Sequence, residues 1–322
     1  IRLKGETTER SFILLGFGNA PELDSLLFLM FLSIYIVTIT GNTFIIVLMV
    51  ANPHLHTPMY FFLGNLACLE ICYSSNILPK MLLSYLGGDR SISVNRCFTQ
   101  YYFFGCLAAA ECYLLAVMSY DRYLAVCKPL HYPSRMNGKL CLQLGAASWI
   151  SGFLSNSILT FLISDLDFCG PNEIEHFFCD SFPIIKLSCS DTHKHCLNVV
   201  HLVYFRHLVL VIVLIPFILI AASYIQIIHT ILQMPSAEGR RKAFFTCIAH
   251  LVVVTLFYCT TGLIHLKPKS SLLPNSSKMV AFSYIVVTPM LNPIIYSLRN
   301  KVKHALRKIF GRRQFFIPPT RK

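Results

Sequence analysis

The sequence reads Met118-Ser119-Tyr120-Asp121-Arg122-Tyr123-Leu124-Ala125-Val126-Cys127 at the end of a long apolar segment. The next two residues, Lys128 and Pro129, end that segment. Adjacent charges at a membrane boundary are costly to place and usually have a function. An arginine beside an aspartate can be held by that neighbour in one state and released to a partner in another. We therefore expect Asp121 and Arg122 to form a switch at a membrane surface.

The composition is that of a membrane protein. Hydrophobic residues make up 55% of the 322 residues and charged residues 13%, whereas a soluble domain carries about 25% charged residues. Segments of roughly 20 apolar residues are long enough to cross a bilayer as helices. The sequence contains seven, at about 24–50, 58–85, 98–127, 139–163, 197–232, 243–265 and 277–298. The predicted fold is an all-α membrane protein, a seven-transmembrane helix bundle that forms one domain over residues 1–322.

Basic residues are distributed unevenly between the two ends of the predicted bundle. The end that holds Arg122 carries more than half of the 28 lysines and arginines and only two acids, Asp121 and Glu238. Cytoplasmic loops are enriched in Lys and Arg, so residues 1–23 are expected outside the cell and the tail 299–322 in the cytoplasm. The excess positive charge predicts attraction to anionic membrane lipid. No nucleic-acid motif accompanies it, and no nucleic-acid partner is expected.

The tail after the seventh span has an amphipathic pattern. Its apolar residues fall at helical spacing with basic residues between them: Val302, Ala305, Leu306, Ile309 and Phe310. This pattern predicts a short amphipathic helix that lies on the inner leaflet.

The 13 cysteines fall into two groups. Eight lie within or at the inner ends of the predicted spans, where packing is the ordinary role of a cysteine. Five lie on the outer side, where disulfides persist, namely Cys97, Cys169, Cys179, Cys189 and Cys196. Four cysteines allow three pairings, and the sequence alone does not choose among them. Cys196 is then left over, and with His193 and His195 it offers an alternative metal site.

Two carboxyl groups, Glu70 and Glu111, fall inside separate spans. A charge at mid-membrane is expensive, so we expect the pair to be neutralised by protonation, by a shared proton or by a cation. Asn42 and Asn292 can add hydrogen bonds to this polar cluster. The alternative is a protonated pair with a structural role only.

Short motifs follow one another along nearly the whole chain. They are Leu14-Leu15-Gly16-Phe17, Gly41-Asn42, Pro58-Met59-Tyr60-Phe61-Phe62-Leu63, Asp121-Arg122-Tyr123, Lys128-Pro129-Leu130-His131-Tyr132, Ser223-Tyr224, Lys242-Ala243-Phe244-Phe245-Thr246-Cys247 with His250, and Pro289-Met290-Leu291-Asn292-Pro293-Ile294-Ile295-Tyr296-Ser297-Leu298-Arg299-Asn300. In this order and spacing they resemble odorant receptors of the rhodopsin-like G protein-coupled class, in the tetrapod-type class II branch.

The resemblance implies a function and a set of paired residues. It implies binding of a small volatile odorant and coupling to a stimulatory heterotrimeric G protein of the olfactory type, which raises cyclic AMP. It implies the disulfides Cys97–Cys179 and Cys169–Cys189. The switch residues that it implies are Asp121, Arg122, Tyr123, Tyr224 and Tyr296. It also implies an allosteric sodium ion at Glu70 and Glu111 with Asn292, and no other cofactor.

The chain departs from the family pattern at two places. The family's usual glycosylation sequon near the N-terminus is absent, and the acceptor pattern is Asn275-Ser276-Ser277, expected in the outer loop before span seven. The family's usual aspartate in span two is Glu70, a longer carboxylate, which changes the geometry of the ion site.

The expected ligand is small, neutral and mostly apolar. No lysine lies in the middle of span seven, so a retinal Schiff base is excluded, and the outer half of span three has no acid to pair with an ammonium group. Placed by resemblance, the pocket is lined by Phe104, Gly105, Ala108, Ala109, Cys112, Asn156, Leu208, Ile212, Tyr258, Thr261, Gly262, His265 and Ile285. The small residues of span three are expected to leave room for the ligand. The hydrogen-bonding candidates are Asn156, Tyr258, Thr261 and His265, and the expected lid is Asp180 with Ser181.

Other functions fit the sequence less well. A rhodopsin-like receptor for a non-odorant lipid or peptide mediator is the main alternative. A transporter or channel would need paired broken helices or an internal repeat, and the sequence has neither. No nucleophile-base or metal-ligand set falls on a common face, so the chain is not expected to be an enzyme.

Overall fold

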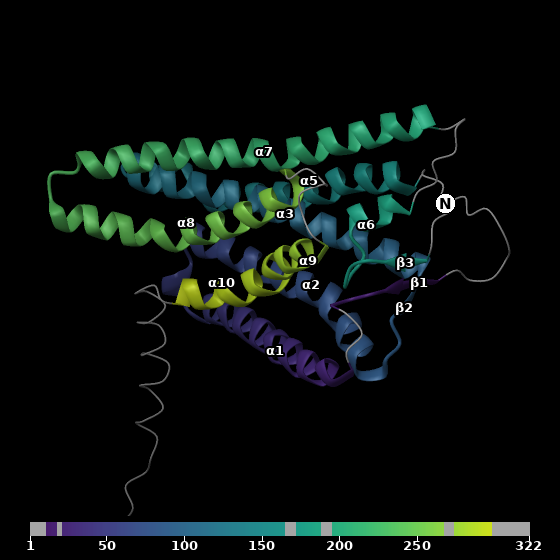
Figure 1. The fold of residues 1–322 in the computed structure, drawn as a ribbon. Coiled ribbons are helices and arrows are strands. Elements are labelled where there is room, and N and C mark those ends of the chain that lie inside the picture. Colours follow the sequence, from purple (N-terminus) through teal and green to yellow (C-terminus); the bar gives the residue numbers. More distant parts are fainter. Residues whose placement is uncertain (1–10, 18–20, 165–171, 188–194, 267–273, 298–322) are drawn as a thin grey trace, which may run out of the picture.

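The computed structural model describes residues 11–17, 21–164, 172–187, 195–266 and 274–297. The long helices are α1 (Pro21–Ala51), α2 (Pro58–Gly87), α3 (Val94–Cys127), α5 (Gly138–Ser164), α7 (His195–Gln233) and α8 (Ala237–Leu266). The shorter elements are η1 (Pro53–Leu55), α4 (Tyr132–Arg135), α6 (Ser181–Lys186), α9 (Pro274–Phe282), η2 (Ser283–Val287) and α10 (Thr288–Ser297). The strands are β1 (Ser11–Leu14), β2 (Ser91–Ser93) and β3 (Glu173–Ile174). Figure 1 shows a helix bundle with the strands and α6 at one end, which we call the sheet end.

The seven predicted spans correspond to α1, α2, α3, α5, α7, α8 and the segment from α9 to α10. Within the described residues, five helices are long and apolar enough to cross a membrane, and α8 is a sixth when its two halves, Ala237–Phe245 and Cys247–Gly262, count as one bent span. The seventh is interrupted by the π-helix η2. The amphipathic helix predicted after this span lies outside the described residues.

Local sequence explains most helix boundaries. Pro58 occupies the first turn of α2, where its missing N–H costs nothing, and the helix ends at Gly88 with a φ of 68°. Ser93 caps α3 by accepting a hydrogen bond from Arg96 N, which starts this helix four residues before the predicted span. The start predicted for the sixth span was also too late, because α8 begins at Ala237 and includes the basic residues at the bundle end.

The sheet joins three segments that are far apart in the sequence. Strand β1 pairs antiparallel with β2, with Phe12 opposite Ile92, and parallel with β3, with Leu14 opposite Ile174. All four of these side chains are buried and pack in one apolar cluster with Cys97. Strand β1, which belongs to the N-terminal segment expected outside the cell, is therefore part of the sheet end.

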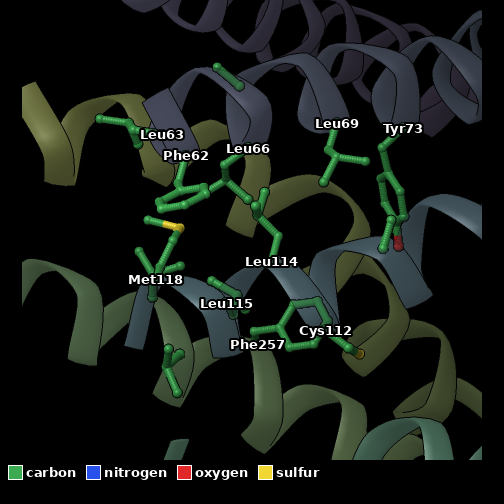
Figure 2. Packing of buried hydrophobic residues seen from close by; sticks show 14 of the residues in the cluster. Phe62, Leu63, Leu66, Leu69, Tyr73, Cys112, Leu114, Leu115, Met118 and Phe257 are labelled. Atoms are coloured by element: carbon green, nitrogen blue, oxygen red, sulfur yellow. The ribbon is translucent and has the colours of Figure 1, made fainter. Parts of the chain in front are cut away.

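Helix α3 is the centre of the bundle, since it contacts α2, α5, α7 and α8. Figure 2 shows its buried residues Leu114, Leu115 and Met118 facing Phe62 and Leu66 of α2. Helix α5 approaches α3 closely at Gly152, where an added methyl group would lie 2.6 Å from both Ala110 N and Cys106 O. Small residues at such contacts let membrane helices pack tightly.

Candidate functional site

A cavity of about 100 Å³ lies among the helices near the sheet end. Its wall comes from α3, α5, α7, α8, α9 and η2, together with the start of α6 and the residues just before it. The lining residues are Tyr101, Phe104, Gly105, Ala108, Ala109, Cys112, Asn156, Leu159, Phe178, Asp180, Ser181, Phe205, Val209, Ile212, Val213, Phe257, Thr261, Ala281 and Ile285. A mostly apolar wall with few polar groups is typical of a site for a small organic molecule.

The bundle brings most of the predicted pocket residues to this wall. Nine of the thirteen line it: Phe104, Gly105, Ala108, Ala109, Cys112, Asn156, Ile212, Thr261 and Ile285. The predicted lid residues Asp180 and Ser181 line it as well. Leu208 instead packs beside the apolar cluster of the sheet end, and Gly262 lies outside the wall. His265 belongs to α8, but its side chain is outside the described part of the chain.

The space beside Gly105 is occupied, which corrects the expectation that this glycine leaves room for a ligand. A methyl group on Gly105 would collide with the side-chain amide of Asn156. That amide donates to Tyr102 O at 2.7 Å and to Thr160 Oγ1 at 3.4 Å. Gly105 therefore accommodates Asn156, and the donor predicted for a ligand is used within the protein.

Tyr258 does not line the cavity, in contrast to the prediction. Its hydroxyl donates to Cys112 O at 3.4 Å, and its ring packs against Phe217 with centroids 5.3 Å apart. The preceding residue, Phe257, occupies the wall. Tyr258 therefore supports Cys112, which itself lines the cavity.

Sequence reasoning missed several aromatic residues of the wall, including Tyr101, Phe178 and Phe205. Phe178 precedes Cys179, whose disulfide to Cys97 holds this segment against α3. The Phe178 ring lies 4.9 Å from the ring of Phe104. Cys179 could have indicated the position of Phe178 from the sequence. Once Cys179 is paired with Cys97 of α3, the residue before it must also lie near α3.

Two titratable groups lie close to the cavity in the segment before α6. Burial raises the pKa of Asp180, although Ser181 N and Oγ both donate to its Oδ1, at 2.7 and 3.2 Å. Burial, together with the charge of Lys278, lowers the pKa of His176 to about 3. His176 is therefore a neutral imidazole that stacks on Phe177 at 4.6 Å. Of these two groups, His176 is therefore uncharged and Asp180 is hydrogen-bonded.

At the opposite end, which we call the arginine end, Arg122 is held by its neighbour. Arg122 Nε donates to Asp121 Oδ2 at 3.0 Å, and Nη2 donates to the same oxygen. The Tyr132 hydroxyl donates to Asp121 Oδ1 at 2.8 Å. Burial and the charge of Asp121 raise the pKa of Tyr132, so its hydroxyl keeps the proton that it donates. Asp121 is fully buried and Arg122 is 6% exposed.

The other predicted switch residues lie at the same end. The Tyr224 hydroxyl is 2.6 Å from His250 Nδ1, which connects α7 to α8. Tyr123 is half-buried, and Lys128 Nζ lies 5.7 Å from the centre of its ring. Tyr296 is in α10, and its side chain is outside the described residues.

Glu70, Glu111 and Asn292 form a buried polar cluster in the middle of the bundle. Asn292 Nδ2 donates to Glu70 Oε1, and the two carboxyl groups are close enough to interact electrostatically. Glu111 Oε1 and Asn292 Oδ1 have no hydrogen-bond partner among the described residues. Asn42 lies on α1 and donates to Thr38 O and to Pro289 O, at 3.0 and 3.3 Å, so it ties α1 to α10.

The predicted disulfide Cys97–Cys179 is present. Cys169, Cys189 and His193 lie outside the described residues. His195 and Cys196 begin α7, but their side chains are outside the described part of the chain, so the suggested metal site stays a prediction. Asn275 lies in the first turn of α9, where Pro274 starts the helix, and the loop predicted for it ends earlier. In the described part of the chain, no three His, Cys, Asp or Glu residues are grouped as a metal site.

Comparison with known proteins identifies the family. The sequence pattern of the olfactory receptor family matches residues 31–313. Olfactory receptor 10A5 of Homo sapiens is 50% identical over 309 residues, which are 95% of this chain and 96% of the relative. Olfactory receptor 10A4 of Homo sapiens is 51% identical over 308 residues, with the same two coverages. The chain belongs to the olfactory receptor family.

The crystal structure of squid rhodopsin resembles this receptor with a TM-score of 0.70 at 16% identity, covering 91% of this chain and 86% of that chain. The olfactory receptor thus has the rhodopsin-like seven-helix fold, and the resemblance predicted from its motifs is confirmed. As an olfactory receptor it is a multi-pass plasma-membrane protein and not an enzyme. The transporter and channel interpretations are thereby excluded.

Proposed function

We propose that this olfactory receptor binds a small, neutral, volatile odorant in the cavity near the sheet end. Binding there activates a stimulatory olfactory-type G protein at the arginine end and raises cyclic AMP. The sheet end is outside the cell and the arginine end is in the cytoplasm. The Cys97–Cys179 disulfide supports this orientation because disulfides persist in oxidising compartments.

The size and chemistry of the cavity carry the proposal. Its volume of about 100 Å³ suits a molecule of the size of benzene or smaller, since an engineered apolar cavity of about 150 Å³ binds benzene. A peptide mediator needs far more space, and a long lipid mediator does too. Apolar burial of roughly 25 cal/mol per Å² supplies most of the affinity for such a ligand.

Asp180, a predicted lid residue, adds a carboxyl group to a wall in which span three was expected to supply no acid. An ionised Asp180 would favour an amine ligand, whereas a protonated one would donate a hydrogen bond to a neutral oxygenated ligand. Burial raises the pKa of Asp180 and favours the second case, and its effect is larger than that of the hydrogen bonds from Ser181, which lower this pKa. We therefore propose alcohols, aldehydes, ketones or esters as ligands in preference to primary amines.

A cyclic AMP reporter assay in cells that express the receptor tests this ligand class. Neutral oxygenated volatiles should be the best agonists, and Asp180→Asn should change their potency by less than about tenfold, because one hydrogen bond contributes about 1 kcal/mol. Asp89→Asn, outside the cavity, is the matched control. Primary amines as the best agonists, with their response lost in Asp180→Asn, would refute the neutral ligand.

The buried acidic cluster fits a sodium ion, which we propose as an allosteric ligand of the resting receptor. Hard cations prefer oxygen ligands, and the cluster offers the Glu70 and Glu111 carboxyl groups and the Asn292 amide oxygen. The free oxygen atoms Glu111 Oε1 and Asn292 Oδ1 are the strongest support, because buried polar atoms normally have partners. The ion would neutralise the negative charge of the cluster.

Sodium should shift agonist potency through this cluster. If sodium binds only the resting state, raising its concentration should weaken the agonist, by about 5-fold or more for a typical coupling. Glu111→Gln should remove that shift, whereas Glu175→Gln, in the segment before α6, should keep it. Agonist titrations in sodium and in choline buffers provide the measurement. Equal sodium dependence in the wild type and in Glu111→Gln would mean that the cluster is structural only.

A further inference from the structure

A second, larger hollow of about 590 Å³ lies at the arginine end, on the side of the bundle away from the odorant cavity. It runs over the first half of α2, between the end of α1 and the start of α5. We call it the α1–α2–α5 groove. Its wall includes Met49 of α1, Phe61 and Cys68 of α2, and Gly138 and Cys141 of α5.

Two polar side chains of the groove wall, His56 and Asn65, are hydrogen-bonded within the protein. His56 Nε2 lies 3.1 Å from Met49 O. Asn65 Nδ2 donates to Phe61 O at 2.9 Å, and Asn65 Oδ1 accepts from Trp149 Nε1 at 3.1 Å. The surface left for an occupant is therefore mainly hydrocarbon, which suits an apolar chain.

The length of the groove matches one leaflet of a membrane. From Thr57 at its mouth to Cys68 at its deep end, α2 advances eleven residues, or roughly 16 Å at 1.5 Å per residue. Half of a hydrocarbon core of about 30 Å is about 15 Å. A chain that enters at the membrane surface would thus reach Cys68 near the middle of the bilayer.

The end of the groove at the membrane surface is basic, which favours a lipid with an anionic headgroup. His54, Arg135 and Lys139 are exposed and lie within a few residues of wall residues in the sequence. Neither Arg135 nor Lys139 forms a salt bridge with another described residue. Of the two acids at this end, Asp121 is buried and bonded to Arg122, so it does not offset the charge at the mouth. Glu238 is exposed in the first turn of α8 and is not part of the groove wall.

We propose that the α1–α2–α5 groove holds one acyl chain of an anionic phospholipid from the leaflet at the arginine end, with its headgroup at Arg135 and Lys139. The occupant follows from an apolar wall, a depth of one leaflet and a basic mouth. The proposal requires the membrane location of the family and is independent of the ligand that the odorant cavity binds.

The only tryptophan of the sequence provides the probe. Trp149 is half-buried and touches the deep end of the groove through Asn65. Bromine atoms on mid-chain carbons quench tryptophan fluorescence on contact. The purified receptor is reconstituted in phosphatidylcholine vesicles that contain increasing fractions of brominated phosphatidylserine or, separately, brominated phosphatidylcholine. Quenching should reach half of its maximum at a lower fraction of the serine lipid.

Two matched pairs of variants distinguish quenching by a lipid bound in the groove from quenching by the surrounding bilayer. Cys68→Phe fills the deep end and should abolish the preference for phosphatidylserine, whereas Cys72→Phe, an exposed cysteine one turn further along α2, should keep it. Arg135→Gln should reduce the preference about fivefold, the effect of one basic residue near a membrane surface. Arg241→Gln is its control, because Arg241 is exposed at the start of α8 and is not part of the groove.

Three outcomes would overturn the proposal. Equal quenching by the two brominated lipids would mean contact with bulk lipid only. Equal behaviour of Cys68→Phe and Cys72→Phe would place the quencher outside the groove. Relief of quenching by added cholesterol would identify a sterol as the occupant.

Discussion

Arg122→Ala is expected to abolish ligand-evoked cyclic AMP while the receptor still reaches the cell surface. In the structure Arg122 is turned toward Asp121 and is 6% exposed, so it cannot contact a partner in this state. In the proposed mechanism, activation separates the inner ends of α7 and α8, and the guanidinium leaves Asp121 for the G protein. Alanine removes the group that would make this contact.

The neighbours of Arg122 should affect the resting state instead. Asp121→Asn removes the charge that holds the guanidinium and should raise cyclic AMP in the absence of ligand. Tyr132→Phe removes one hydrogen bond to Asp121, with a net contribution of about 1 kcal/mol. We therefore expect a smaller rise in basal activity, at most about tenfold in the ratio of active to resting receptor.

Reporter activity must be normalised to surface expression, because removing one member of a buried ion pair costs about 3–5 kcal/mol of stability. Flow cytometry of a tagged receptor supplies the surface level, and Tyr132→Phe keeps both charges as the conservative comparison. A normal ligand response from well-expressed Arg122→Ala would show that Arg122 does not contact the G protein.

The helices were predictable from the sequence because a membrane span depends on length and composition alone. Each of the seven predicted segments corresponds to a helix or, for the last, to α9, η2 and α10 in succession. The interruption by η2 was not predictable, since Ser283–Val287 contains neither proline nor glycine. The sheet was missed for a different reason. Its strands have two to four residues each, which is too short for an alternating pattern to show.

The candidate site was predictable where the sequence or the resemblance fixes the face of a helix. Phe104, Ala108 and Cys112 recur at helical spacing, and all three line the cavity. On α8 the sequence could not choose between Tyr258 and its neighbour Phe257. Adjacent residues are about 100° apart around a helix, and the rotation of α8 is set by packing. Tyr258 points to Cys112, and Phe257 occupies the wall.

A hydrogen bond within the protein explains why Asn156 differs from its predicted role as a ligand contact. Asn156 is a plausible ligand contact from its polarity and its position on α5. In the folded chain its amide reaches across to Tyr102 O and fills the space beside Gly105. The sequence carries no sign of this bond, because its two partners lie on different helices and are 54 residues apart.

Gly152→Ala should destabilise the receptor, because α3 leaves no space for a side chain at this position of α5. The new methyl group would lie 2.6 Å from Ala110 N and from Cys106 O, and both of these are backbone atoms of α3. Backbone atoms cannot turn aside as a side chain can, so α3 and α5 must separate. Overpacking of this kind typically costs about 1–3 kcal/mol.

Gly64→Ala on α2 is the matched control, because its methyl group would meet the flexible end of Met49, with Cε at 3.2 Å. Met49 can move, and alanine favours a helix over glycine by about 1 kcal/mol. Gly64→Ala should therefore leave stability unchanged or slightly raised. The melting temperatures of the two purified variants in detergent measure the difference directly.

Separating α3 from α5 should also change ligand recognition. Helix α3 carries Gly105 and Ala109 of the cavity wall, and α5 carries Asn156 and Leu159. We expect Gly152→Ala to lower agonist potency in those receptors that still reach the surface, whereas Gly64→Ala should keep the wild-type potency. Equal melting temperatures and equal agonist responses of the two variants would contradict this prediction. The close α3–α5 contact at Gly152 would then not determine the shape of the cavity.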